Sequence, residues 1–88
     1  MDVNEHLIRR AWSMPMGPTR KVVLIALACH ADEHGDVLDG MDVERLSALA
    51  CVTVSAGRMA LAWLLDMGYV ARDRAGRLRV TGAGAAQP

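Results

Sequence analysis

Two histidines, a cysteine and an aspartate lie close enough together in the sequence to suggest a metal site. They are Cys29, His30, His34 and Asp36. Thiolate and imidazole are ligands that zinc prefers, so residues of these types within a few positions can meet one ion. The spacing matches no known zinc pattern, however, and Cys29 is expected to point inward from a helix. We therefore expect the chain to hold no metal and no cofactor.

Catalysis has less support than metal binding. The sequence contains no glycine-rich phosphate loop, no nucleophile with a base nearby in sequence, and no paired carboxylates in an apolar setting. The acidic residues Asp32, Glu33 and Asp36 are typical of a hydrated loop. We expect a binding module without catalytic residues, and not an enzyme.

Arginine side chains near the end of the chain are the strongest indication of a nucleic-acid partner. Four of them fall within eight residues, namely Arg72, Arg74, Arg77 and Arg79. Arg77 and Arg79 alternate with apolar residues, as on the solvent face of a strand, and such a cluster can reach phosphates or a minor groove. The alternative is a solvated hairpin whose charges maintain solubility and protect an edge strand.

The net charge of the chain is zero, which removes a global electrostatic attraction to nucleic acid. The distribution of charge is more informative. Between Asp32 and Glu44 lie six acidic residues and no Lys or Arg, whereas six Arg and only two Asp follow from Arg45 onward. We expect an acidic side and a basic end.

Length and composition predict one helix-rich domain. The chain has 88 residues, of which 52% are hydrophobic and 23% charged, enough for one packed core. A core without Phe must be built from Leu, Val, Ile, Ala and Met, which favours helices. Cys29 and Cys51 are expected to be reduced thiols in this core. We expect a cytoplasmic protein without a membrane segment, because the start lacks a signal-peptide pattern and no apolar run is long enough to span a bilayer.

The spacing of apolar residues predicts the first elements of this domain. Residues 1–17 are expected to form an N-terminal arm or short helix. Helical periodicity predicts a helix from Thr19 to about Ala31. The polar residues that follow end this helix, and Val37 and Leu38 are expected to form a short strand.

Cap residues and a change of period predict the remaining elements. Asp42 and Thr53 are expected to cap two further helices, the second of which ends at Gly68. Apolar residues then alternate with arginines, which predicts a β-hairpin within 70–81. The small, uncharged residues 82–88 are expected to be a disordered tail.

This order of elements over residues 18–81 is that of a winged helix-turn-helix domain, mostly α with a small β-hairpin wing. The stretch 18–70 resembles the helix-turn-helix domain of phage and plasmid replication-initiator and regulatory proteins. The resemblance is carried by Ala26 to Ala31, Gly35, Leu46, Ser47, Thr53, Leu61, Leu64 and Gly68 to Val70. It implies a phage or plasmid transcriptional regulator that binds double-stranded DNA, and we expect it to act as a homodimer.

In such a regulator the third helix enters the major groove. The expected DNA contacts are Thr53, Ser55 and Arg58 on this helix, together with Arg72, Arg74, Arg77 and Arg79 of the hairpin. Proteins of this kind usually carry a polar or basic pair and Thr-Val early in the helix, where this chain has Val54, Ser55, Ala56 and Gly57. We therefore expect base readout to be sparse.

Apolar residues further along the third helix support a different function. Met59, Trp63 and Leu65 are expected to be exposed, and Met59 and Trp63 are neighbours on one helix face. With Trp12 they form a predicted partner interface. Alternatively, the N-terminal arm folds back and covers them. The second functional hypothesis is a protein-interaction module, such as a phage-encoded inhibitor of a host nucleic-acid-binding complex, of the anti-CRISPR type.

Overall fold

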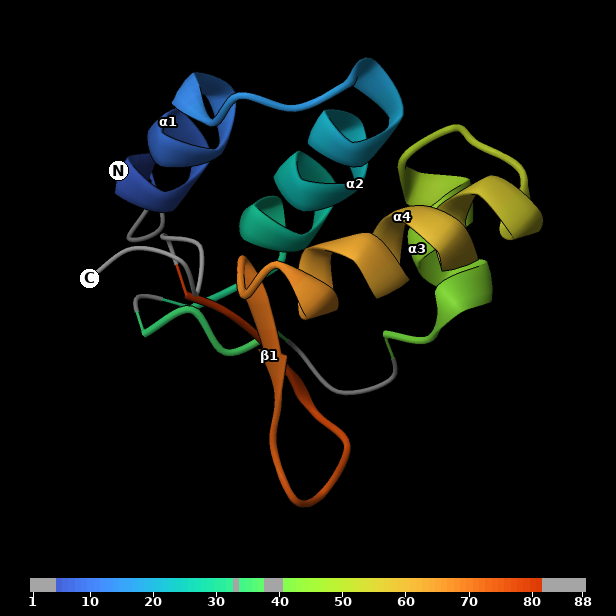
Figure 1. Cartoon of the computed structure of the whole chain (residues 1–88). Helices are drawn as coiled ribbons and strands as arrows, with labels where there is room; N and C mark the ends of the chain where they lie inside the picture. The colour runs from blue at the N-terminus through green and yellow to red at the C-terminus, as the bar shows by residue number, and fades with distance from the viewer. Residues whose placement is uncertain (1–4, 33, 38–40, 82–88) are drawn as a thin grey trace.

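The computed structural model describes residues 5–32, 34–37 and 41–81. Over these residues the fold is mostly helical with one small antiparallel sheet, which confirms the predicted balance of helix and strand. The elements, in chain order, are α1 (Glu5–Ser13), α2 (Pro18–Cys29), α3 (Val43–Leu49), α4 (Val54–Asp66), β1 (Val70–Arg72) and β2 (Leu78–Val80). Figure 1 shows α1 beside α2, α4 beside α3, and the hairpin extending away from the helices. The predicted tail, 82–88, lies outside the described residues.

The two predicted helix caps are confirmed. The Asp42 side chain accepts a hydrogen bond from the Arg45 backbone N–H at 2.8 Å, at the start of α3. The Thr53 hydroxyl accepts one from the Ala56 N–H at 3.1 Å, at the start of α4. Each cap satisfies a backbone donor that the first helical turn leaves without a partner. The end of α4 is also as predicted, because Gly68 follows it with a φ of +82°.

The helices α3 and α4 form a sharply bent pair. Residues 50–53 join them, and their axes bend by 104°. At the crossing, the buried Ser47 faces the buried Gly57, and a Cβ on Gly57 would overlap the Ser47 side chain. The Ser47 hydroxyl donates to the Val43 carbonyl at 2.6 Å, so it is satisfied within its own helix. The absence of a side chain at Gly57 therefore allows the two backbones to approach closely.

The loop after α2 forms hydrogen bonds with β2, along the edge of the hairpin that does not pair with β1. In the hairpin, Val70 pairs with Val80 and Arg72 with Leu78. The Val80 N–H donates to the Gly35 carbonyl at 2.7 Å, and the Val37 N–H donates to the Leu78 carbonyl at 3.0 Å. Among the described residues no strand forms here: Asp36 and Val37 make only isolated bridges, to Arg79 and Ala31, and Leu38 lies outside the described residues. Val37, Val70, Leu78 and Val80 are all buried, so these segments add one face to the core.

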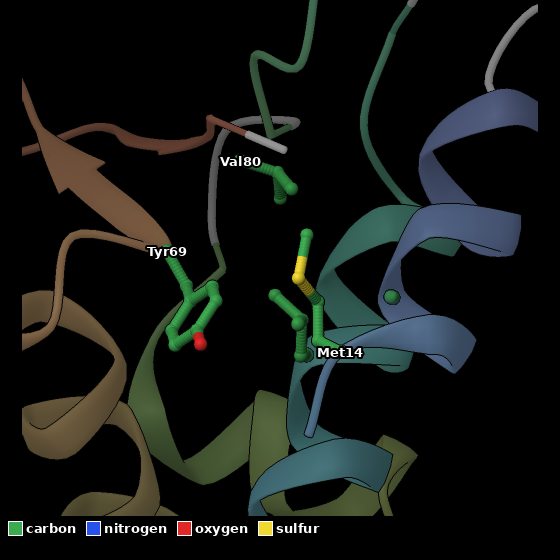
Figure 2. Close-up of a pocket in the computed structure, with 5 residues that line it drawn as sticks. Met14, Tyr69 and Val80 are labelled. Atoms are coloured by element: carbon green, nitrogen blue, oxygen red, sulfur yellow. The ribbon is translucent and has the colours of Figure 1, made fainter. Parts of the chain in front are cut away.

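The N-terminal segment packs on the body through α1. Leu7 and Ala11 of α1 are buried, and the helix lies along α2. The Lys21 ammonium group donates to the Trp12 carbonyl at 2.6 Å, which ties the end of α1 to the start of α2. Figure 2 shows Met14 pointing into the space between Tyr69 and Val80. The apolar hollow left there has a volume of about 10 Å³, which is too small for a ligand.

The prediction that both cysteines are core residues is wrong. Cys29 and Cys51 are free thiols and both are exposed. Cys29 shares the outward face of α2 with Val22 and Ile25, while Leu27 and Ala28 take the buried positions. Cys51 lies in the turn between α3 and α4 with a φ of +59°. Apolar neighbours in sequence do not distinguish the inward from the outward face of a helix.

Taken singly, none of the described helices is long and apolar enough to cross a membrane. Only α3 and α4 together meet the length and composition of a span, and then only across their 104° bend.

Candidate nucleic-acid interface

The outward face of α4 carries few groups that could read bases. It consists of the exposed residues Ser55, Arg58, Met59, Ala62 and Asp66, which the helical repeat places on one side. Ser55 and Arg58 are thus brought together at the surface, as predicted. Their single positive charge is matched by Asp66 further along, so this face has no excess positive charge of its own.

Arg20 adds a positive charge beside α4, and sequence analysis did not single it out. Arg20 and Thr19, in the first turn of α2, line a hollow of about 240 Å³ together with Ala56, Met59 and Ala60 of α4. The guanidinium carbon of Arg20 lies 4.2 Å from the centroid of the Trp63 ring. This cation–π contact with the Trp63 ring orients the Arg20 side chain. The N–H groups at the edge of the planar guanidinium can still donate hydrogen bonds to another group. Arg20 and Trp63 lie far apart in the sequence, so only the packing of α2 on α4 shows that they are in contact.

Trp63 and Leu65 are less exposed than predicted. Trp63 stacks on Tyr69 with ring centroids 5.6 Å apart, and Arg20 covers it further. Both Trp63 and Leu65 are partly buried against the core. The expectation of full exposure is therefore wrong for Trp63 and Leu65 and is confirmed only for Met59, which is 72% exposed.

The N-terminal arm does not cover Met59. Its Leu7 is buried and its Ile8 is half-buried against the core, so the arm does fold onto the body, but the helix packs along α2. Trp12 stays 61% exposed and lines a different hollow, between α2 and α3. The structure thus separates Trp12 from Met59, which the sequence analysis had grouped in one interface.

The four hairpin arginines are all exposed, but they do not share one face. Arg72 lies on the side of the sheet that carries Leu78, and it donates to the Gly76 carbonyl at 3.2 Å. Arg79 is paired with Ala71 on the opposite side. Arg77 alternates with Leu78 and so lies on the side of Arg79. Arg74 is in the turn at the tip.

The turn of the hairpin is organised by Asp73. Its carboxylate accepts hydrogen bonds from the backbone N–H groups of Ala75, at 2.9 Å, and Arg77, at 2.8 Å. An aspartate that bonds the backbone two residues ahead is a common way to stabilise a turn. The acidic residue among the hairpin arginines therefore shapes the tip that presents them.

Arg79 is held by the loop after α2. Its Nε donates to the His34 carbonyl at 3.3 Å and lies 3.6 Å from the Asp36 carboxylate. Because this arginine already has an anionic neighbour, a phosphate would have to compete for it. Arg74, exposed in the turn at the tip, is better placed than Arg79 to contact a nucleic-acid backbone.

Three residues of the predicted acidic side have structural roles. Asp36 faces Arg79, and Asp42 caps α3. The Asp32 carboxylate accepts from the N–H groups of His34, at 2.8 Å, and Asp36, at 3.0 Å. The His34 hydrogen bond is the main reason that the pKa of Asp32 lies below its ordinary value. Glu33 and Asp39 lie outside the described residues.

Within residues 5–32, 34–37 and 41–81, no three His, Cys, Asp or Glu side chains converge as a metal site would require.

Comparison of the chain with protein-family models, with curated proteins and with solved structures finds no match. The functional assignment therefore depends on the geometry of this chain.

Proposed function

We propose that the chain is a winged helix-turn-helix module that binds double-stranded DNA, with α4 as the recognition helix and the β1–β2 hairpin as the wing. The observation that carries the proposal is the bend of 104° between α3 and α4 across a four-residue connection, 50–53. DNA-binding helix-turn-helix units join two helices at about 90–120° through a turn of 3–4 residues. The hairpin follows α4 directly and carries exposed arginines at and near its tip.

The positive groups suit contacts to phosphate better than contacts to bases. Arg20 and Arg58 lie on or beside the outward face of α4, and Arg74 and Arg77 belong to the wing. Arginine pairs well with phosphate through its planar fork of N–H donors. Ser55 and Arg58 offer few hydrogen bonds to base edges, so phosphate contacts have to supply most of the affinity. The module would bind many duplexes with modest discrimination among them.

The test is binding to a fluorescently labelled duplex, measured by anisotropy at low salt. Replacing Arg74 and Arg77 together by Ala should weaken binding to a selected site and to random duplex by similar factors, because phosphate contacts carry no sequence information. Arg58→Ala should make the free energy of binding to the selected site less favourable by about 1–3 kcal/mol, and should affect binding to random duplex less.

Arg9→Ala is the matched control. Arg9 is an exposed arginine on α1 whose side chain is paired with Glu5 at 2.7 Å, and it belongs to neither α4 nor the hairpin. Its replacement removes one positive charge, as Arg58→Ala does and half of what the hairpin variant removes, yet it should leave DNA affinity nearly unchanged. An equal loss in the Arg9 variant and in the hairpin variant would contradict an interface built on the hairpin.

A second function is favoured by one observation, the exposure of Met59. This large apolar side chain is 72% exposed near the middle of the outward face of α4, with Ala62 close by. Exposed apolar groups on a helix face suit a groove on a protein partner better than the major groove. The alternative is therefore a protein-interaction module, for example an inhibitor of a host nucleic-acid-binding complex. Failure of the intact chain to bind duplex at low salt would make this alternative the leading one.

A further inference from the structure

The side of α4 that carries Trp63 has no basic residue of its own. Arg58, the single arginine of α4, is five positions from Trp63 and so lies about 140° away around the helix. Arg20 of α2 supplies a positive charge on this side, with its guanidinium carbon 4.2 Å from the centroid of the Trp63 ring. It also lines the hollow of about 240 Å³ between the two helices, whose other lining residues are Thr19, Ala56, Met59 and Ala60.

Arg20 has no acidic partner among the described residues. None of the residues that line the hollow is Asp or Glu, and the first turn of α2 contains no acidic residue. Over the described part of the chain, the Trp63 ring is the partner found for the guanidinium. A cation–π contact uses the face of the guanidinium and leaves N–H donors at its edge, where they form a planar fork that matches two phosphate oxygens. Arg20 therefore combines a fixed position with open hydrogen-bonding capacity.

Two aromatic rings attach Arg20 to the body of the molecule. Trp63 stacks on Tyr69, with ring centroids 5.6 Å apart and an angle of 22° between the ring planes. Tyr69 in turn lines the small apolar hollow into which Met14 points, beside Val80 (Figure 2). A long exposed side chain ordinarily loses rotamer freedom when it binds a ligand, and an arginine already held in a stack loses less.

We propose that Arg20 contacts a phosphate of the DNA strand that borders the Trp63 side of α4, and that Trp63 is the positioning residue that directs it there. The inference rests on the proposed function, in which α4 lies in the major groove. A helix in that groove has a phosphate backbone on each side, and contacts to the backbone fix its register and orientation. The hollow gives a phosphate room to approach Arg20, and the hydroxyl of the exposed Thr19 can donate a second hydrogen bond.

The contact is tested by the anisotropy of a labelled duplex over a series of salt concentrations. Arg20→Gln should weaken binding at least about fivefold at low salt, to a selected site and to random duplex alike, because a phosphate carries no sequence information. It should also make the slope of the logarithm of the binding constant against the logarithm of salt shallower by about 0.9. Arg9→Gln is the matched control. It removes one positive charge from α1 and should leave both the affinity and the slope unchanged.

The positioning role is tested by changing the ring while keeping the charge. Trp63→Leu should weaken binding about two- to fivefold, as expected for the loss of an exposed cation–π contact, with an unchanged salt slope. Trp63→Phe keeps an aromatic face and should restore most of the affinity. In the Arg20→Gln chain, Trp63→Leu should have no further effect, because the arginine that the ring positions is absent. Circular dichroism checks that each variant is folded.

Two results would overturn the inference and leave the proposed function intact. The first is duplex binding whose affinity and salt slope are the same in Arg20→Gln as in the parent chain. The second is a Trp63→Leu change that weakens the Arg20→Gln chain as much as the parent chain, which would mean that the ring only supports the fold. An intact chain that does not bind duplex at low salt would contradict the proposed function and this inference together, so the two failures are distinguishable.

Discussion

At the scale of single residues, Asp32 shows how an exposed carboxylate can organise a site without contacting a ligand. It bonds the N–H groups of His34 and Asp36, and the same turn brings Gly35 and Val37 against β2. The acidic residues of this segment predicted only a hydrated loop. The turn also sets Asp36 opposite Arg79, so Asp32 indirectly determines how strongly that arginine is held.

The acid sensitivity of the fold should depend on Asp32. In the folded chain its pKa is lowered from the ordinary value of 3.8, mainly by the hydrogen bond from the His34 N–H. The ionised carboxylate therefore stabilises the fold, and this contribution is fully present when the pH lies above the pKa of the unfolded chain. This contribution is lost as the pH falls through the lowered pKa, in the range below about 4. Asp32→Asn keeps an oxygen acceptor without a charge, and its unfolding midpoint in urea should therefore change less between neutral pH and pH of about 3 than that of the parent chain.

Asp32→Ala separates the charge from the acceptor. It removes both, so the chain should be less stable than Asp32→Asn at neutral pH and should also lose the acid-sensitive component. If all three proteins showed the same change of urea midpoint with pH, the carboxylate of Asp32 would have no part in acid unfolding.

At the scale of elements, the crossing of α3 and α4 depends on a position without a side chain. Ordinarily Gly→Ala inside a helix stabilises a protein by about 0.5–1 kcal/mol. Gly57→Ala should do the reverse, because the added Cβ would overlap the Ser47 side chain. We expect a loss of about 1–3 kcal/mol in the free energy of unfolding, the usual cost of overpacking, measured by urea denaturation.

The exchanged pair provides the control for this crossing. Ser47→Gly together with Gly57→Ala replaces the serine side chain on α3 with a methyl group on α4 and should restore much of the loss, although glycine in α3 has its own cost. A stabilising Gly57→Ala would contradict the close approach of the two helices.

Elements set by local chemistry could be predicted from the sequence. Asp42 and Thr53 each cap a helix through a backbone group three residues ahead, and the hairpin alternates apolar and charged residues, so short windows contain the signal. Features that join distant segments could not be predicted. The contact of Arg20 with Trp63 and the close approach of Gly57 to Ser47 depend on how helices pack, which periodicity alone does not specify.

At the scale of the whole molecule, the acidic loop after α2 and the basic hairpin are brought together by the fold, where Asp36 lies 3.6 Å from Arg79. Described acidic residues are used in capping, in the turn after α2 and in holding Arg79. Arginines remain exposed beside α4 and on the hairpin. The predicted separation into an acidic side and a basic end is therefore wrong at this contact, but a net charge of zero does not exclude a local basic interface.

The candidate interface was predicted in part. Ser55, Arg58 and Arg74 are exposed, as expected of contact residues. Arg79 proved to be engaged by Asp36, and Arg20 was missed. Both differences arise from pairs of residues that lie far apart in the chain, so no local pattern could have indicated them.

The most direct test of the proposed function is the salt dependence of duplex binding by the intact chain. Anisotropy of a labelled duplex should show binding at low salt that weakens as salt is added. With two or three of the arginines Arg20, Arg74 and Arg77 on phosphates, the logarithm of the binding constant should fall against the logarithm of salt with a slope of about −2 to −3, since each contact contributes about 0.9. An absence of binding at low salt, or binding that salt does not weaken, would contradict the proposal that this chain binds DNA.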